Sequence, residues 1–392
     1  YIGIFIIMFS VISSGMVAVM TQNIGAGRPG VAYQARQLGL TFNAVLGIIV
    51  SLILTFGAGA ILAGVGVAHA LMQPARTYLQ IVGGFCILNA LIPICSSYLR
   101  AFGFSKEPLY ASIIGNVINF CLNAFFLFVL HKGVAGVATA TVISRIINLV
   151  IVVLLGAVLV KAKQHPERES NRAVMGQIIR IGLPSACETA IYNVSMTLVI
   201  RFLNQMDAQG LNVTARSYTM QITNFSYCVG AALAQANAIM TGWHIGAKEY
   251  DACDRGTKKA AVIGVIVAVI LETVFTLCSG WIMQLFSKDP QMVSLVGKLL
   301  AIDIVLEIGR VTNLVYGQAL KTSGDAVFPV VMGACFMILC SVGGTYLFGI
   351  RLGLLAVGAY IGMTGDECVR AVGMYLRWKS GKWKEKGLVK SR

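Results

Sequence analysis

Charged side chains are scarce in this 392-residue chain: Asp, Glu, Lys and Arg make up 12% of it, against 57% hydrophobic residues. With a mean hydropathy of +0.78, the chain has more apolar surface than a soluble protein can bury. This composition excludes an ordinary soluble domain and indicates membrane spans. The net charge of +15 does not favour nucleic acid as a partner, because the basic residues lie in the gaps between apolar runs.

The motifs of enzymes and metal sites are lacking as well. The pattern G-x-x-x-x-G-K-[ST] does not occur, which excludes the usual ATP-binding loop. The ten cysteines form no C-x-x-C or Cys/His pattern, and the four histidines have no metal-ligand spacing. We therefore predict a protein that is not an enzyme and holds no cofactor. We expect an ion gradient, rather than ATP, to drive any pumping.

Long apolar runs are what the sequence has instead. A helix needs about 20 mostly apolar residues to cross a bilayer. Eleven stretches meet this condition, at residues 1–20, 41–66, 77–99, 109–130, 134–160, 177–203, 214–242, 260–285, 294–320, 327–349 and 352–376. They do not show the short alternating segments of a membrane β-barrel. The sequence therefore predicts an all-α polytopic membrane protein.

The lysines and arginines are distributed unevenly among the gaps. One set of alternate gaps, together with the adjoining span ends and the C-terminal tail, holds 21 of them, and the other set with its adjoining span ends holds six. Because cytoplasmic loops are enriched in basic residues, the first set and the C-terminus are predicted to be cytoplasmic. The tail at 377–392 mixes tryptophan with lysine, which favours an interfacial anchor and orientation signal. A specific lipid-binding or regulatory site is the alternative.

The chain repeats itself at a distance of about 221 residues. The segment "LRAFGFSKEP" returns as "LKTSGDAVFP", with Leu, a basic residue, Gly and Pro at matching places. Three pairs of segments align: 99–108 with 320–329, 23–32 with 244–253, and, at a distance of 220, 133–138 with 353–358. Six spans separate the copies, so the sequence predicts two parallel-repeat six-helix lobes.

The repeat also sets the expected domain boundaries. These are an N-lobe at 1–160, holding helices 2–6 of its repeat, a cytoplasmic linker at 161–176, a C-lobe at 177–376 holding helices 7–12, and a basic cytoplasmic tail at 377–392. The span at 177–203 opens the second lobe, and its counterpart would precede Tyr1. We therefore expect a fragment that lacks the first transmembrane helix, with the first lobe one helix short.

Several strings carry a family resemblance, in this order along the chain: "QNIGAGRPGVA", "NFCLN" with "GVAGVATAT", "GLPSACE" and "ALKTSGDAVFP". In this order and spacing on a twelve-helix repeat, the chain resembles the multidrug and toxic compound extrusion (MATE) family over essentially its whole length. The resemblance implies two six-helix lobes around a V-shaped central cavity. It also implies secondary active export of amphipathic, often cationic compounds, driven by entry of H⁺ or Na⁺ across the plasma (inner) membrane. We expect a monomer.

A flippase for lipid-linked oligosaccharides, from the same superfamily, is the alternative function. It would need several cationic residues facing a large cavity to bind pyrophosphate. Apart from Arg310, the cavity charges expected in the second lobe are acidic, which favours cationic substrates. A membrane enzyme or structural protein is disfavoured, since the repeat carries intramembrane carboxylates and no catalytic cluster.

Charged residues inside the second-half spans are the first candidates for coupling or substrate contact, because charges in mid-bilayer tend to face a cavity or a partner. Asp303 and Glu307 lie one turn apart on one helix face, which suits a proton or cation carrier. Arg310 could instead neutralise Glu307 in a structural pair. In the family, a carboxylate is common two turns after the proline of the lobe's first span. This chain has Tyr192 there and Glu188 one turn earlier.

Asparagines form a stripe in the 109–130 span of the first half: Asn116, Asn119 and Asn123. Hydrogen bonding between helices is the simplest explanation. The family resemblance implies a second one, a cation site in which Asn119 and Thr141 match the usual residues and Asn123 replaces a usual Asp. Amide and hydroxyl oxygens can ligate Na⁺, though weakly without a carboxylate.

The other intramembrane charges are expected to matter less. Three of them either face a cavity or pair with one another: Arg145, Arg216 and Glu272. Three more lie toward the end of the last span, where a local Glu367–Arg370 pair is favoured over substrate contact: Asp366, Glu367 and Arg370.

Overall fold

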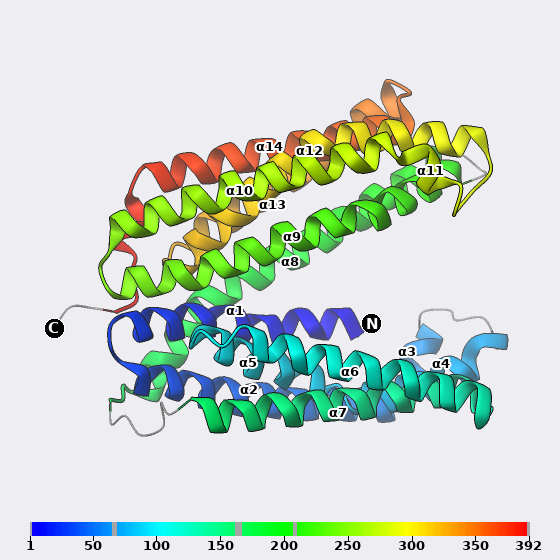
Figure 1. Ribbon diagram of the computed structural model, residues 1–392. Coiled ribbons are helices and arrows are strands. Elements are labelled where there is room, and N and C mark those ends of the chain that lie inside the picture. Colours follow the sequence, from blue (N-terminus) through cyan, green and yellow to red (C-terminus); the bar gives the residue numbers. More distant parts are fainter. Residues whose placement is uncertain (1, 65–68, 161–166, 207–209, 390–392) are drawn as a thin grey trace. The chain divides into compact units, whose positions relative to one another are not determined.

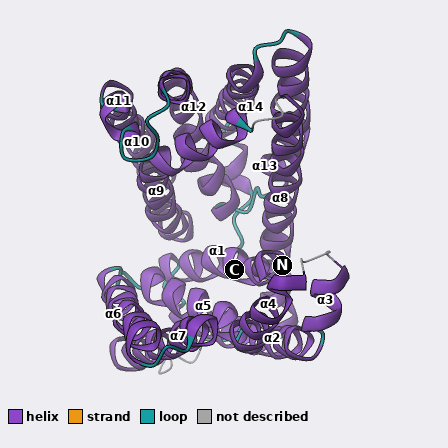
Figure 2. Cartoon of the chain, turned by 90° about the vertical axis from the view of Figure 1, so that its right-hand side faces the viewer, coloured by secondary structure: helices purple, strands orange, loops and turns teal. Residues whose placement is uncertain are grey.

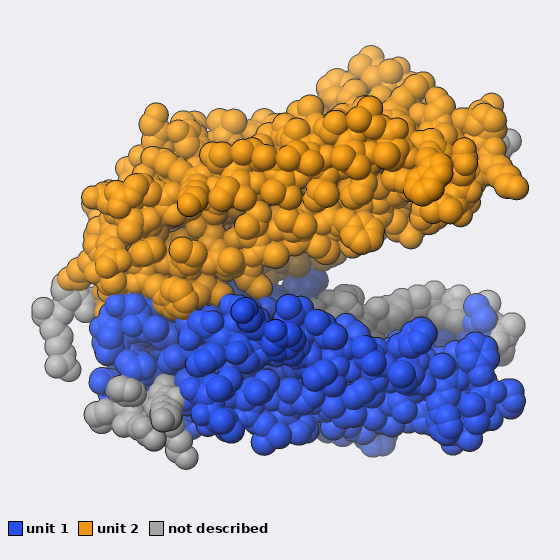
Figure 3. Space-filling view, in the orientation of Figure 1, with its two compact units in different colours: residues 1–183 blue, residues 184–392 orange. Residues whose placement is uncertain are grey.

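The computed structural model describes residues 2–64, 69–160, 167–206 and 210–389, which are helical almost throughout and contain no strand (Figure 1, Figure 2). The predicted all-α class is confirmed. Two compact units make up the chain, Tyr1–Leu183 and Pro184–Arg392 (Figure 3). Part of the predicted linker, 161–166, and the last three residues of the tail lie outside the described residues.

Unit 1 consists of packed helices. Its elements are α1 (Ile2–Gly25), α2 (Pro29–Phe56), α3 (Ala58–Gly64), α4 (His69–Gly84), α5 (Ile87–Ala101), α6 (Lys106–Ala124), the π-helix η1 (Phe125–Val129) and α7 (Gly133–Leu159). The first part of α8 (Asn171–Met206) also belongs to it, so this helix begins earlier than the predicted 177. The Gln34 side chain donates to the backbone oxygen of Glu169 at 2.7 Å and to Oδ1 of Asn171 at 2.6 Å. These bonds hold the start of α8 against α2.

Unit 2 begins inside α8 at Pro184. Its further elements are α9 (Leu211–Gly246), α10 (Tyr250–Leu277), α11 (Ser279–Met283), α12 (Pro290–Thr322), α13 (Val327–Phe336), the π-helices η3 (Met337–Val342) and η4 (Thr345–Arg351), α14 (Leu355–Lys379) and the 3₁₀ turn η5 (Lys382–Glu385). Helix α12 packs against α9, α10 and α14 and therefore forms the centre of the unit.

Membrane-spanning potential is widespread among these helices. By length and composition, six helices of the described part can cross a membrane. A seventh span results if Leu71–Gly84 and Ile87–Ala101, which meet at 41°, are taken as one bent helix. Helices make up most of each of the eleven predicted stretches. The long helices α8, α9, α12 and α14 are not among the six, and α12 and α14 carry the ion pairs described below.

The repeated turn has the same local structure in both units. In unit 1, after α5, the amide of Phe104 donates to the carbonyl oxygen of Leu99 at 3.0 Å. In unit 2, after α12, the amide of Asp325 donates to the carbonyl oxygen of Leu320, also at 3.0 Å. This bond closes a helix C-terminus of the Schellman type. The residues that the two segments share at aligned positions therefore specify the same type of helix C-terminus.

The third pair of repeated segments aligns differently from the prediction. His131 and Gly133 follow η1 with φ of 50° and 53°, and Gly353 and Leu355 follow η4 with φ of 69° and 53°. Matching these turns requires a distance of 222 residues, so the predicted distance of 220 was wrong. Among the described residues, one π-helix, η1, precedes the turn in unit 1, and two, η3 and η4, precede it in unit 2. Their wider i→i+5 spacing therefore shifts the register by different amounts in the two units.

The core of unit 2 has two apolar clusters with a charged layer between them. On α12, the first cluster ends at Leu306 and the second begins at Val311. On α14, the last member of the first cluster is Met363, and the second begins at Met374. The intervals on both helices carry charged side chains at the same level. Because α12 has 33 residues, this layer lies near the middle of the helix.

The tail folds back onto unit 2 through two tryptophans. The rings of Trp378 and Trp383 stack with centroids 4.1 Å apart, and each residue is 1% exposed. Both indole N–H groups are satisfied: Trp383 donates to the backbone oxygen of Trp378, and Trp378 donates to Oδ1 of Asp254, each at 2.9 Å. The prediction of an interfacial anchor was wrong for these two residues, because a buried indole with a bonded N–H serves as core.

A matched pair of substitutions tests this tail contact. Gly103 and Gly324 occupy the same turn, with φ of 89° and 99°, so replacing either by Ala strains the backbone. Only at Gly324 would the new Cβ also clash with the backbone oxygen of Lys386. We expect Gly324→Ala to lower the melting temperature of the purified protein more than Gly103→Ala does. Equal losses would contradict the packing of the tail on this turn.

Candidate functional site

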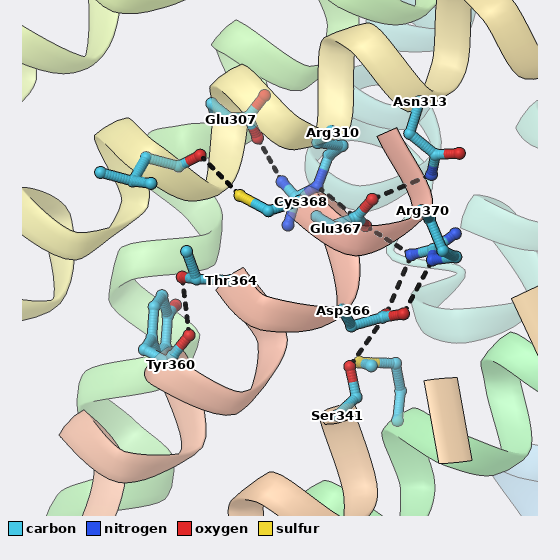
Figure 4. A network of polar contacts seen from close by, with 12 residues as sticks. Glu307, Arg310, Asn313, Ser341, Tyr360, Thr364, Asp366, Glu367, Cys368 and Arg370 are labelled. Atoms are coloured by element: carbon cyan, nitrogen blue, oxygen red, sulfur yellow. Dashed lines mark hydrogen bonds and ion pairs between the residues drawn. The ribbon is translucent and has the colours of Figure 1, made fainter. Parts of the chain in front are cut away.

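The charged layer of unit 2 is a network of ion pairs (Figure 4). Arg310 on α12 forms an ion pair with Glu307, one turn earlier, as the sequence predicted. The Nε atom of Arg310 also lies 3.7 Å from Oε1 of Glu367 on α14. Asn313, one turn further along α12, donates to Oε2 of Glu367 at 3.0 Å. The i, i+3 spacing aligns these α12 side chains on the face that meets α14.

The network continues along α14 through Arg370. Its guanidinium donates to both oxygens of Asp366, at 2.8 and 3.0 Å, and lies 2.9 Å from Oε1 of Glu367. Ser341 on η3 donates to Oδ2 of Asp366 at 3.0 Å. The predicted Glu367–Arg370 pair is confirmed, but Glu367 also contacts α12. Arg370 meets two carboxylates of its own helix, whereas Arg310 meets one carboxylate of α12 and one of α14 and therefore links the two helices.

Beside this network lies a cluster of three carboxylates. Glu272 on α10 and Asp303 and Glu307 on α12 each place one oxygen within 4.8 Å of the others. The three residues are 0%, 2% and 0% exposed. Both oxygens of Glu272, Oδ2 of Asp303 and Oε2 of Glu307 are shielded from water and accept no well-aligned hydrogen bond, although Ser226 lies beside Glu272. Three buried negative charges this close would repel strongly, and a bound proton or metal ion would offset that repulsion.

The sequence predicted two members of this cluster and missed the third. Asp303 and Glu307 share a helix face, as expected from their spacing. Glu272 was assigned a cavity or a pair with an arginine, and among the described residues no basic group lies within ion-pair distance of it. The one sequence signal for Glu272 as a site residue was its position as an acidic residue inside the predicted 260–285 span.

A cavity of about 250 Å³ opens within unit 2 beside the charged network. Five charged side chains line it: Glu188, Arg310, Lys321, Glu367 and Arg370. Tyr192, Tyr227 and Asn313 add aromatic and amide groups. The prediction that its charges are acidic apart from Arg310 was wrong, because Lys321 and Arg370 also face it. Arg370 reaches the cavity because α14 presents it on the same face as Glu367.

The cavity places Glu188 and Tyr192, two of the predicted site residues, on its α8 wall. Nζ of Lys321, from the end of α12, lies 2.5 Å from Oε2 of Glu188, and both side chains are 15% exposed. The sequence had placed Lys321 in a repeated turn and gave it no partner. The pair joins helices that are far apart in the sequence, so no spacing rule could reveal it.

The predicted first-half cation residues are only partly brought together in unit 1. Asn123 donates to Oδ1 of Asn119 at 3.0 Å, and Asn119 donates to Oγ of Ser144 on α7 at 3.3 Å. Thr141 donates to the backbone oxygen of Val137 in its own helix at 2.9 Å. Asn116 is exposed on the surface of the unit. The hydroxyl that meets Asn119 is thus Ser144, one turn beyond the predicted Thr141.

Comparison with known proteins shows the family to which the chain belongs. A family model described as MatE matches residues 2–125 and 184–347, most of both units. The chain belongs to the MATE family. MATE proteins are transporters rather than enzymes, and the protein is accordingly a multi-pass membrane transporter. The family moves organic cationic drugs and toxins.

Individual MATE relatives match along most of their length. The "Uncharacterized transporter YisQ" of Bacillus subtilis is 32% identical over 394 residues, covering 99% of this chain and 86% of the relative. The "Probable multidrug resistance protein NorM" of Thermotoga maritima is 21% identical over 326 residues, covering 80% of this chain and 68% of the relative.

Solved MATE structures share the fold. The one described as "Crystal structure of MATE in the straight conformation" has a TM-score of 0.88 at 18% identity, covering 97% of this chain and 86% of its own. A second solved structure with this fold is of a MOP superfamily transporter from Pyrococcus furiosus, whose description states that the reverse polarity of its binding pocket suggests a different function. Its TM-score is 0.86 at 17% identity. It covers 100% of this chain and 86% of its own.

Proposed function

We propose that this MATE protein exports amphipathic organic cations in exchange for H⁺ or Na⁺. One observation carries the proposal: the buried Glu272–Asp303–Glu307 cluster, in which four of the six carboxylate oxygens accept no well-aligned hydrogen bond. Such a cluster is stable when it holds a cation and strained when it does not. It therefore favours taking up a coupling ion from one side and releasing it to the other. A relative from rabbit, Oryctolagus cuniculus, is described as "Multidrug and toxin extrusion protein 2", which agrees with this substrate class.

Competition between ion and drug provides the exchange mechanism. Glu307 joins the carboxylate cluster to Arg310, and Arg310 joins it to the cavity through Glu367. An ion that enters the cluster changes the charge seen by Arg310, and this alters the potential at the cavity wall. By thermodynamic linkage, a drug that binds one charge state of the cavity weakens the binding of the ion, and the reverse holds equally. In this scheme the protein is a monomer of the cell membrane with its C-terminus in the cytoplasm.

The flippase alternative has one observation in its favour, the basic lining of the cavity by Arg310, Lys321 and Arg370. A pyrophosphate would be attracted by such a set. Each of these basic groups is already paired with a carboxylate, however: with Glu307, Glu188 and Asp366 respectively. The net charge offered to a dianion is therefore small, which favours the antiporter.

Transport in proteoliposomes under separate gradients tests the proposed function. We expect accumulation of ethidium, a fluorescent organic cation, when a pH or a Na⁺ gradient is imposed, and its loss when nigericin or monensin collapses that gradient. Liposomes without protein are the control for passive entry. Ethidium movement that ignores both gradients would contradict ion coupling. Transfer of a labelled pyrophosphate-linked lipid between leaflets, without ethidium transport, would instead support the flippase.

A further inference from the structure

One ion pair in the cavity differs from the others. Arg310 and Arg370 each meet two carboxylates, whereas Lys321, among the described residues, has only Glu188 within 4.0 Å. The contact between Nζ and Oε2 is 2.5 Å long, but Oε2 has no aligned hydrogen-bond donor. This pair therefore has less hydrogen-bond support than the arginine network and is the easiest to open.

The free energy needed to open the Glu188–Lys321 pair depends on the charge of the ligand that enters the cavity. Both side chains are 15% exposed, so each charge is largely removed from water. A simple cation that binds Glu188 leaves Lys321 without a carboxylate within 4.0 Å, and a simple anion that binds Lys321 leaves Glu188 with only the more distant Arg370. An unpaired buried charge is strongly unfavourable. A molecule with both charges satisfies both side chains at once.

The surrounding surface suits a flat apolar group. Tyr192 lies one turn after Glu188 on α8, and Tyr227 of α9 lines the same cavity. The guanidinium carbon of Arg310 lies 5.9 Å from the centroid of the Tyr227 ring, so that ring already faces a cation. A cavity of about 250 Å³ has room for one small aromatic molecule.

We infer that this cavity binds aromatic zwitterions, with the ligand's ammonium on Glu188, its carboxylate on Lys321 and its ring beside Tyr192 and Tyr227. The inference rests on the proposed function for its transport role, because it names which ammonium-bearing compounds the site favours. Among the ammonium-bearing compounds of the proposed function, it ranks aromatic zwitterions above plain organic cations as ligands of this cavity. The selectivity comes from leaving no buried charge unpaired rather than from the sign of the cavity's total charge.

Equilibrium binding to the purified full chain in detergent tests the inference with a matched series of indoles. Tritiated L-tryptophan is the zwitterion, tryptamine the cation and indole-3-propionate the anion. We expect tryptophan to bind at least about tenfold more tightly than either competitor, which is within the range of close charge-pair energies. Equal or tighter binding of tryptamine would overturn the inference, and so would the absence of tryptophan binding.

Variants connect the preference to the ion pair. Glu188→Gln and Lys321→Met are each expected to abolish the zwitterion preference, whereas the exchange Glu188→Lys with Lys321→Glu should retain it, because both charges remain. Lys298→Met, at an exposed position of α12, is the control for loss of a lysine. Thermal melts identify any variant that fails to fold. If a single variant is unfolded, the zwitterion preference of the folded double exchange variant is the deciding measurement. Loss of preference in the folded exchanged pair, or its persistence in both single variants, would contradict the assignment.

The binding measurement separates this inference from the proposed function, because it uses no gradient. If ethidium transport is gradient-driven but the indoles show no zwitterion preference, only the inference fails. If tryptophan binds selectively but no gradient drives transport, the proposed exchange fails and the binding site remains.

Discussion

Replacing Asp303 by Asn is expected to reduce drug efflux at least about tenfold, a loss typical of removing one coupling energy between two sites. Asn has nearly the same shape as Asp but cannot exchange a proton or carry the charge that attracts a cation. Arg310 pairs with Glu307, so Asp303 holds a less compensated charge in the same cluster. Efflux of ethidium from cells that express equal amounts of the parent and variant protein measures the effect.

Stability should move in the other direction. A buried carboxylate with an unpartnered oxygen, Oδ2 of Asp303, is costly, so its neutralisation should leave the melting temperature unchanged or raise it. Asp251→Asn, at an exposed position of α10, is the matched control and should change neither property. Efflux close to that of the parent protein, from mildly acidic to mildly alkaline pH, would show that Asp303 has no coupling role.

Replacing Arg370 by Met is expected to lower the free energy of unfolding by about 3–5 kcal/mol, the cost of breaking a buried ion pair by removing one partner. The Arg370 side chain is 3% exposed and holds both Asp366 and Glu367. Without it, two buried carboxylates lose their closest positive charge. Denaturant unfolding of the purified protein measures the loss.

Two further variants show whether the loss comes from unpaired charge. Arg351→Met removes an exposed arginine that donates to the Tyr346 hydroxyl, and it should have a small effect. Combining Arg370→Met with Asp366→Asn and Glu367→Gln should recover much of the lost stability, because no uncompensated charge remains. A triple variant as unstable as Arg370→Met alone would point to lost packing instead.

The sequence predicted the helices and their repeat well because both are encoded locally. Apolar runs of sufficient length specify helices, and six of these in the described part, or seven with the bent pair, are apolar enough to cross a membrane. The Leu–basic–Gly pattern specifies the same hydrogen-bonded helix end at Gly103 and Gly324. The same local logic predicted the Glu307–Arg310 pair. It failed at the turns after η1 and η4, because one π-helix precedes the turn in unit 1 and two precede it in unit 2, and sequence matching does not reveal the resulting shift in register.

The candidate site could be predicted only where its residues share one helix. Asp303 and Glu307 were found from their spacing, but Glu272 joins them from α10, and no periodicity on α12 points to it. Likewise, Lys321 meets Glu188 only because α8 and α12 both line the cavity. The prediction that the cavity is lined mainly by acidic side chains was therefore wrong. The sequence shows which charged residues lie within a span, but not which of them face the same cavity.

The most direct test of the central claim measures ions released when a drug binds. Ethidium is added to the purified protein in weakly buffered detergent solution containing Na⁺, and pH and Na⁺ electrodes record the release. If the carboxylate cluster exchanges its ion for the drug, the parent protein releases H⁺ or Na⁺ as ethidium binds, and Asp303→Asn releases clearly less. Ethidium binding that releases neither ion from the parent, or as much from the variant as from the parent, would contradict the account.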